Sequence, residues 1–310
     1  MGRTRMIRIT FLGTSAAQPT LQRGLSAIAV RREGELLLFD CGEGSQRQMM
    51  RFGTGFGVSA VFFTHLHADH YLGLLGFART LNMQGREAPL SVYGPPPTAT
   101  LLEQALHLGF ERYSFPIEFH ELCGGERIER AGCSIEALAV DHGIPALGYA
   151  LVEPNRPGEF SVERAAALGL PPGPLYGELQ HGRELLAPDG RRVRPADVLG
   201  PPRRGRRIVL SGDTRPCESV REAARGADLL IHEGTFGDGL RERALETHHS
   251  TAREAAEVAR AAGARRLVLT HFSSRYEDDV SSLAREARSL FPATELARDG
   301  LTIEVPLPPG

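Results

Sequence analysis

The 310-residue sequence contains no lysine, so all 36 of its basic side chains are arginine. We attribute this first to a compositional bias of the source and only second to function. Basic and acidic residues nearly cancel, and the formal net charge is -2 at pH 7. Any affinity for nucleic acid must therefore come from a local basic patch and not from overall charge.

Cysteine is also scarce, with Cys41, Cys123, Cys133 and Cys217 far apart along the chain. None of them forms a Cys-x-x-Cys pair. This spacing indicates neither a disulfide framework nor a zinc site built from cysteine, and it predicts reduced, mostly buried thiols.

Long apolar runs are absent as well, so no segment has the length of a membrane span. The basic residues 1–8 precede an apolar run that is too short for a signal-peptide core. Hydrophobic residues make up 41% of the chain, enough for a full core in one large domain or two smaller ones. We expect a cytoplasmic globular protein that does not enter a membrane.

The most informative segment is His65-Leu66-His67-Ala68-Asp69-His70, which directly follows the apolar run 58–63. Neutral imidazole nitrogens and carboxylate oxygens are ligands that suit zinc and similar divalent ions. His65 and His67 would share one face, while Asp69 and His70 come where the chain turns into a helix. The segment predicts two metal ions at the end of a strand, against the alternative of isolated surface or core histidines.

The rest of the chain alternates apolar strands with helices. Short strands are predicted at 7–12, 27–30 and 35–39, and a strand and helix pattern continues through 98–110. In the second half, Thr251 and Glu254 form a capping box that opens a helix closed by Gly263. This βαβ rhythm predicts an α/β fold, in which a mixed sheet carries helices on its outside.

Further candidate ligands follow later strands: His142, Asp213 and His271. The carboxyl ends of strands in layered α/β proteins gather at one rim, so these side chains can reach the first cluster. We assign His65, His67 and His142 to one zinc and Asp69, His70 and His271 to a second, with Asp213 as the bridge. Two adjacent cations would lower the pKa of a shared water and clamp an anionic oxygen, which is metal-assisted hydrolysis.

Between 154 and 207 the chain is rich in proline, glycine and arginine. Long connections without regular structure are uncommon in compact domains and are usually functional or disordered. The composition predicts an inserted arm at 154–200 within a single domain that spans 1–310. The arginine cluster Arg203, Arg204, Arg206 and Arg207 that follows is predicted to contact phosphate, although an exposed, solvated run would have the same composition.

The His-x-His-x-Asp-His segment, with the distant His142, Asp213 and His271, resembles the metallo-β-lactamase superfamily along nearly the whole chain. That resemblance implies a four-layered αβ/βα sandwich with two zinc ions in a cleft at one edge. Other segments resemble the ribonuclease Z family within it: 38–48, 211–216, His232-Glu233-Gly234-Thr235, His249-Ser250-Thr251 and 270–276.

The resemblance implies an endonuclease that removes the 3′ trailer from precursor tRNA and leaves a tRNA 3′-hydroxyl and a trailer 5′-phosphate. It further implies a flexible arm that holds the tRNA elbow, and a homodimer in which one subunit's arm clamps the tRNA cut by the other. Two departures stand out. Gly234 replaces the usual alanine, and arginine replaces the customary lysines of the arm, at Arg156, Arg164, Arg183, Arg191, Arg192 and Arg194. Arginine still neutralises phosphate.

Three residues receive catalytic roles on this resemblance. Asp69 would orient the attacking water or accept its proton. His249, oriented by Glu233, would protonate the departing group at the 5′ side of the trailer or bind the scissile phosphate. Asp40 and the turn 42–44 are predicted to support the zinc loops by hydrogen bonds, although a tight turn after a strand is an equal explanation.

Several other functions use the same ligands. A lactamase would need export, for which there is no signal, whereas a thioesterase or a cyclic-nucleotide phosphodiesterase would satisfy the site without the arm. A non-catalytic RNA-binding scaffold on a retired hydrolase fold is the alternative outside enzymes. None of the seven predicted ligands is missing, which favours a hydrolase.

Overall fold

Two seven-stranded sheets packed face to face form the centre of the computed structural model, which describes residues 6–108 and 112–308. The strand order is β18-β1-β3-β4-β5-β6-β7 in the first sheet and β17-β15-β14-β13-β10-β9-β8 in the second. Part of the basic N-terminal segment and the end of the predicted stretch 98–110 lie outside the described residues.

The strands of the first sheet are β1 (Ile7–Gly13), β3 (Ala27–Arg32), β4 (Glu35–Phe39), β5 (Val58–Phe62), β6 (Leu90–Gly94), β7 (Ile117–Glu121) and β18 (Thr302–Val305). Those of the second sheet are β8 (Arg127–Arg130), β9 (Cys133–Ala139), β10 (Leu147–Val152), β13 (Arg207–Leu210), β14 (Leu229–Glu233), β15 (Leu267–Thr270) and β17 (Thr294–Leu296). The short strands β2 (Ser15–Ala16) and β16 (Phe272–Ser273) pair with each other outside both sheets.

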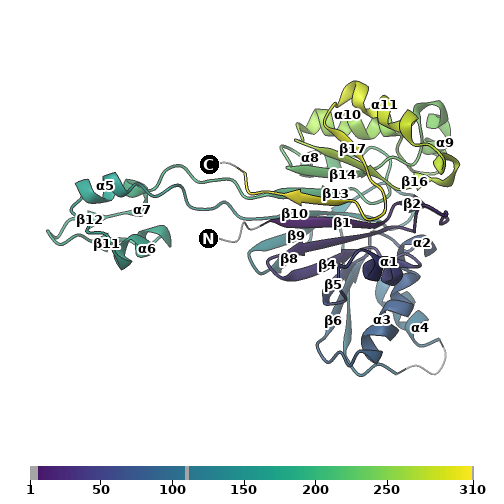
Figure 1. Ribbon diagram of the computed structural model, residues 1–310, viewed down its shortest axis with the longest axis horizontal. Coiled ribbons are helices and arrows are strands. Elements are labelled where there is room, and N and C mark those ends of the chain that lie inside the picture. The colour runs from purple at the N-terminus through teal and green to yellow at the C-terminus, as the bar shows by residue number, and fades with distance from the viewer. Residues whose placement is uncertain (1–5, 109–111, 309–310) are drawn as a thin grey trace. The chain divides into compact units, whose positions relative to one another are not determined.

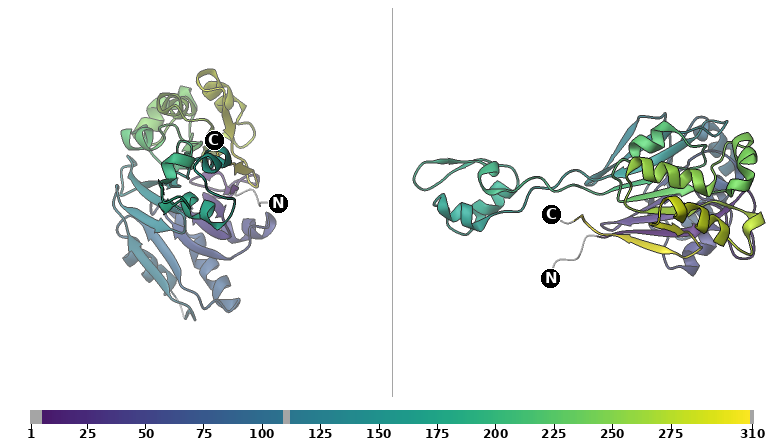
Figure 2. Two further views of the ribbon diagram at one scale, coloured as in Figure 1. Left: turned by 90° about the vertical axis from the view of Figure 1, so that its left-hand side faces the viewer. Right: turned by 90° about the horizontal axis from the view of Figure 1, so that it is seen from above.

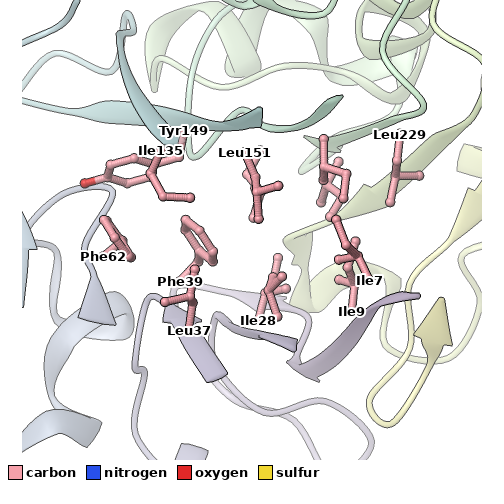
Figure 3. Packing of buried hydrophobic residues seen from close by; sticks show 14 of the residues in the cluster. Ile7, Ile9, Ile28, Leu37, Phe39, Phe62, Ile135, Tyr149, Leu151 and Leu229 are labelled. Atoms are coloured by element: carbon pink, nitrogen blue, oxygen red, sulfur yellow. The ribbon is translucent and has the colours of Figure 1, made fainter. Parts of the chain in front are cut away.

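Apolar side chains of alternate residues fill the space between the two sheets. Ile9 and Ile28 from the first sheet lie opposite Leu151 and Leu229 from the second (Figure 3). These residues are at most 7% exposed. Burial of this kind stabilises by about 25 cal/mol per Å² of apolar surface, so the alternating pattern of the strands fixes which face turns inward.

Helices cover the outer face of each sheet (Figure 1). On the first sheet these are α1 (Ser45–Arg51), α3 (Gly73–Met83) and α4 (Thr98–Leu106), which pack over a second apolar cluster. On the second they are α8 (Glu218–Ala223), α10 (Ala252–Ala262) and α11 (Ser281–Leu290), over a third cluster. The predicted four-layered αβ/βα sandwich is therefore confirmed.

Short helices complete the edge where the sheets end: α2 (Ala68–Tyr71), α9 (Arg241–Glu246) and the 3₁₀ turns Asp238–Leu240 and Ser274–Tyr276. The predicted cap of α10 is present, because Thr251 accepts a hydrogen bond from the amide of Glu254 and the Glu254 carboxylate accepts one in return. Gly263 ends this helix in the left-handed conformation. Among the described residues no helix is long and apolar enough to cross a membrane.

The chain divides into two compact units: 1–152 with 207–306, called here the main unit, and 153–206 with the last residues, called the arm. The arm contains α5 (Val162–Ala167), α6 (Pro174–Gln180), β11 (Leu185–Leu186), β12 (Arg192–Val193) and α7 (Pro195–Val198). Within the arm these elements gather around each other (Figure 2). Their own small core consists of Ala165, Leu170, Leu179, Ala187, Val193 and Val198.

The structure of this region adds to the sequence analysis in one respect and corrects it in another. Regular structure is present where the composition gave no indication of it, because scattered apolar residues such as Leu179 and Val193 pack locally despite many prolines and glycines. The arginine cluster after the arm is not a continuous exposed loop, and Arg206 is not available to phosphate. Arg206 is buried and held by Glu153 at 2.7 Å through two guanidinium nitrogens, and Arg207 belongs to β13.

Candidate metal centre

The strand ends at one edge of the main unit bring all seven predicted ligands together. His65, His67, Asp69 and His70 follow β5, His142 follows β9, Asp213 follows β13 and His271 follows β15. Three groups of possible ligand atoms, each within 4.8 Å of one another, are His65 with His67 and His142, His65 with His70 and Asp213, and Asp69 with His70 and His271. The two triplets predicted for separate ions are among these groups.

The Asp213 carboxylate lies at the centre of the cluster. Its Oδ2 atom is 3.2 Å from His271 Nε2, 3.4 Å from His70 Nε2, 3.8 Å from His65 Nε2 and 3.9 Å from His142 Nε2. One oxygen shared among four imidazoles from both predicted triplets is the arrangement expected of a bridging ligand.

Groups behind the cluster fix the orientation of its buried imidazoles. His70 Nδ1 lies 2.8 Å from the Asp40 carboxylate, and His142 Nδ1 lies 3.0 Å from the main-chain oxygen of His248. Because these oxygens only accept, each Nδ1 donates to them, and Nε2 is the ring nitrogen that faces the centre. This is the usual second layer of a histidine metal site.

Two matching relays hold the other imidazoles. The Thr64 hydroxyl donates to Asp40 at 2.9 Å and lies 3.0 Å from His65 Nδ1, where it accepts. The Thr235 hydroxyl donates to Glu233 at 2.6 Å and lies 3.0 Å from His271 Nδ1. In each relay a buried carboxylate turns a threonine hydroxyl so that its lone pair faces a histidine.

The residues present fit a divalent metal. Nε2 of His70 and Nε2 of His271 are buried atoms without a hydrogen-bond partner, which is costly unless something binds them. Burial, together with neighbouring imidazoles, holds the pKa of His65 well below its usual value, so this ring stays neutral as a ligand must. Burial would raise the pKa of Asp213, but His271 and His70 hold it well below its usual range.

Strained backbone is concentrated at this edge. Outside glycine, positive φ angles occur among the described residues at Ala17, Asp40, His248 and His271, with values from 56° to 60°, and at Glu33. Such conformations cost about 1–3 kcal/mol each and are retained mainly at functional sites. Four of these five residues carry or hold a predicted ligand, so packing energy of the sandwich is used to orient the cluster.

The predicted supporting role of the segment 40–44 is confirmed in part. Asp40 holds Thr64 and His70, as expected. Gly42 is needed for space, because a Cβ atom there would lie 2.3 Å from the Asp69 main-chain oxygen. Glu43 is exposed and makes no contact with the cluster, so its side chain has no such role.

Glu233 and His249 lie together beside the cluster. His249 Nδ1 is 2.8 Å from Glu233 Oε1, and the buried Glu233 also accepts from the amides of Thr214 and Ser250. Burial would lower the pKa of His249, but the Glu233 carboxylate raises it to about 9. His249 is therefore oriented and proton-bearing at neutral pH, with its ring near His142 and Asp213.

Sequence reasoning missed three supporting groups. The amide of Ala17 donates to Asp69 Oδ2 at 2.8 Å, and no sequence signal indicates this contact. The main-chain oxygen of His248 holds His142, which side-chain identity does not reveal. Thr235 had a signal, because it closes the His232-Glu233-Gly234-Thr235 segment two residues after Glu233.

Residues 22–271 match the model of the metallo-beta-lactamase superfamily. The chain is 61% identical over 303 residues to a ribonuclease Z of Myxococcus xanthus (97% of this chain, 99% of the relative). It is 50% identical to a ribonuclease Z of Methanosarcina acetivorans over 305 residues, 98% of this chain and 100% of that one.

A solved structure has a similar fold. The crystal structure of the short form of human tRNase Z superposes with a TM-score of 0.71 at 28% identity, covering 96% of this chain and 99% of that chain. Likeness in fold therefore extends over nearly the full length of both molecules.

Proposed function

The chain belongs to the metallo-beta-lactamase superfamily and, within it, to the ribonuclease Z family, and we propose that it cuts precursor tRNA with two zinc ions held by the seven clustered ligands. It is an endoribonuclease of tRNA 3′ processing, as the likeness to ribonucleases Z over the full chain indicates. The observation that carries the proposed site is the convergence of five imidazoles and two carboxylates on the edge of the sandwich.

The donor set favours zinc over harder cations. Imidazole nitrogen suits zinc, whereas magnesium and calcium prefer sites made wholly of oxygen ligands. His65, His67 and His142 would hold one ion, and Asp69, His70 and His271 the other. Asp213 would bridge them, which its central Oδ2 supports.

When bound, the metals would supply a water of lowered pKa and positive charge for the phosphoryl oxygens. The chain's own groups do the rest. The Ala17 amide fixes the Asp69 carboxylate so that one oxygen can orient a water or accept its proton. Glu233 does not reach the substrate itself and acts as a positioning residue, because it fixes the ring of His249 so that Nε2 can donate a proton.

The expectation that His249 protonates the 5′ side of the trailer is wrong. If the trailer keeps the 5′-phosphate, water attacks phosphorus and the broken bond joins phosphorus to the 3′ oxygen of the tRNA. The proton donated by His249 therefore goes to the last nucleotide of the tRNA and not to the trailer. This follows from the product termini alone.

The arm is proposed to hold the tRNA. Arg183, Arg191, Arg192 and Arg194 pair with arm carboxylates, and these side chains are 43% to 68% exposed. Exposed ion pairs of this kind contribute about 0–1 kcal/mol, so phosphate can replace the carboxylate partner at little cost. Phosphate contacts position a nucleic acid without reading its sequence.

We further propose that the enzyme works in the cytoplasm as a homodimer, in which one subunit's arm serves the other subunit's site. Exposed apolar side chains in the main unit, such as Leu21 (95%) and Met50 (68%), are available for subunit contact.

Subunit mixing tests the dimer. One variant lacks the arm, and the other carries His65→Ala with an intact arm. If the arm acts on the opposite subunit, mixing two inactive variants restores cleavage. No recovery in a preparation shown to contain mixed dimers would reject this arrangement.

The function itself is tested with purified protein, zinc and a 3′-extended precursor tRNA. Cleavage should yield a 3′-hydroxyl on the tRNA and a 5′-phosphate on the trailer, and metal analysis should find close to two zinc ions per chain. An uncut precursor would reject the proposal. Cleavage by protein that holds one ion per chain would reject the two-ion site but not the proposed function.

A further inference from the structure

A cavity of about 670 Å³ opens beside His249 in the main unit, and neither the metal centre nor the arm accounts for it. Its volume falls in the range of about 300–1,000 Å³ that is typical of small-molecule sites. The lining residues are Asp141, Arg215, Pro216, Arg241, Glu242, Leu245, His249, Glu254 and Glu257. His249 is thus shared between the cavity and the metal cluster, since its ring also lies near His142 and Asp213.

The charges of the wall argue against a phosphate as the occupant. Four carboxylates line the cavity against two guanidiniums. Both guanidiniums already have partners: Arg215 Nε lies 3.0 Å from Asp141 Oδ2, and Arg241 Nε lies 3.1 Å from Glu254 Oε1. An anion would meet net negative charge there.

The same wall suits a neutral, planar group with hydrogen-bonding edges. Asp141 is held by Arg215 on one side and by His248, whose Nδ1 lies 3.2 Å away, on the other. The ion pairs fix donors and acceptors in place, while Pro216 and Leu245 offer apolar surface for a ring face. Nucleobases combine these two requirements, with polar edges and an apolar face.

The bond that is hydrolysed indicates which nucleotide of the substrate supplies this base. We propose that the cavity binds the base of the last nucleotide of the mature tRNA, the nucleotide whose 3′ oxygen leaves. This inference rests on the proposed function. Because His249 lies both beside the ligand cluster, where the bond is cut, and in the wall of the cavity, the sugar of that nucleotide lies against His249 and its base reaches the cavity.

A single substrate change tests this without altering the protein. Two 3′-extended precursor tRNAs are compared that differ only in the last tRNA nucleotide, which is intact in one and abasic in the other. Wild-type protein should cut the abasic precursor at least about tenfold less efficiently, as loss of one or two hydrogen bonds predicts. Equal kcat/KM for the two substrates would overturn the inference.

A protein variant then tests whether the base occupies the cavity. Leu245→Trp fills the cavity from an exposed position on α9, and it should cut intact and abasic precursors with similar kcat/KM, because neither can use the cavity. Met83→Trp is the matched control, since Met83 is also exposed but lies on α3 away from the cavity. It should keep the wild-type ratio. Continued discrimination by the Leu245→Trp variant, or its absence in the control, would overturn the assignment.

Two further results remain decisive. If the cavity-filling variant does not fold, Arg241→Gln replaces it, and this change should alter the ranking of precursors ending in the four bases. An unaltered ranking counts against the cavity. If wild-type protein cuts neither precursor, the proposed function fails and this inference fails with it, an outcome distinct from equal cleavage of both.

Discussion

The main unit and the arm use charged side chains in opposite ways. In the main unit, Asp213, Glu233 and four of the five imidazoles proposed as ligands are buried and fixed by several hydrogen bonds. In the arm, arginines such as Arg192 and Arg194 are exposed and share one carboxylate partner. Hydrolysis needs groups held rigidly in a low-dielectric site, whereas a polyanionic backbone is captured by charges that can exchange partners. Chemistry and capture should therefore be separable by mutation.

The largest effect is expected from His65→Ala, which removes one of the three imidazoles proposed to hold the first ion. Cleavage of precursor tRNA and of a small aryl phosphodiester should both fall by about a thousandfold or more, because metal charge stabilisation is worth several kcal/mol. Metal analysis and kinetics measure this, with exposed His107→Ala as the control. Normal turnover by the first variant would remove the metal centre from the mechanism.

Glu233→Gln should follow in size. The amide keeps the shape but loses the charge that orients and protonates His249, so kcat should fall roughly a hundredfold with little change in KM. Thr235→Val leaves the Glu233 charge in place but removes the hydroxyl that reaches His271, so its loss of bound metal measures the support of His271. If Glu233→Gln loses bound metal as readily as Thr235→Val does, the main role of Glu233 is to support the candidate ligand His271 and not to hold His249 as an acid.

Removal of the arm tests directly whether hydrolysis by the main unit is independent of tRNA binding by the arm. Joining Gly158 to Gly200 should be feasible, because a Cβ on Gly158 would lie 2.0 Å from the Gly200 oxygen, so the two chain segments already touch. Precursor cleavage should fall about a hundredfold, equivalent to about 3 kcal/mol of charge-assisted hydrogen bonds. Hydrolysis of the aryl phosphodiester should stay normal. An equal decrease on both substrates would show that the arm also supports the site.

A milder change keeps the arm and removes its charge. Replacement of Arg191, Arg192 and Arg194 together by alanine should weaken precursor binding and lower the slope of log affinity against log salt by about one for each phosphate that is no longer neutralised. Replacement of Glu184 by glutamine is the matched control, because it frees two of these arginines. An unchanged salt slope would place the phosphate-binding groups elsewhere.

The smallest effect concerns Gly234, where the chain departs from the usual alanine of its family. A Cβ there would meet Leu269 at 3.4 Å and 3.5 Å, which is ordinary contact, and φ is not positive. Gly234→Ala should therefore raise the free energy of unfolding by about 0.4–1 kcal/mol and leave activity unchanged. Gly42→Ala, with its 2.3 Å approach to the Asp69 oxygen, should instead lower the unfolding temperature.

The sequence predicted the layers of the main unit but not the inside of the arm. Runs such as 35–39 and 267–270 alternate or remain apolar over a full strand, so their period indicates the structure directly. The apolar residues of the arm, among them Ala165 and Val198, are isolated between prolines and glycines and show no period. Their packing depends on neighbours that only the folded arm provides.

Residue identity by itself indicated the chemistry of this protein: histidine and aspartate at successive strand ends predict a metal site and its seven candidate ligands. Only the tertiary structure decided how the site is held. The Ala17 amide, the His248 oxygen and the Thr235 hydroxyl reach their partners from segments distant in sequence, through main-chain groups or strained backbone. Such groups are common to every residue, so their roles exist only once the chain has folded.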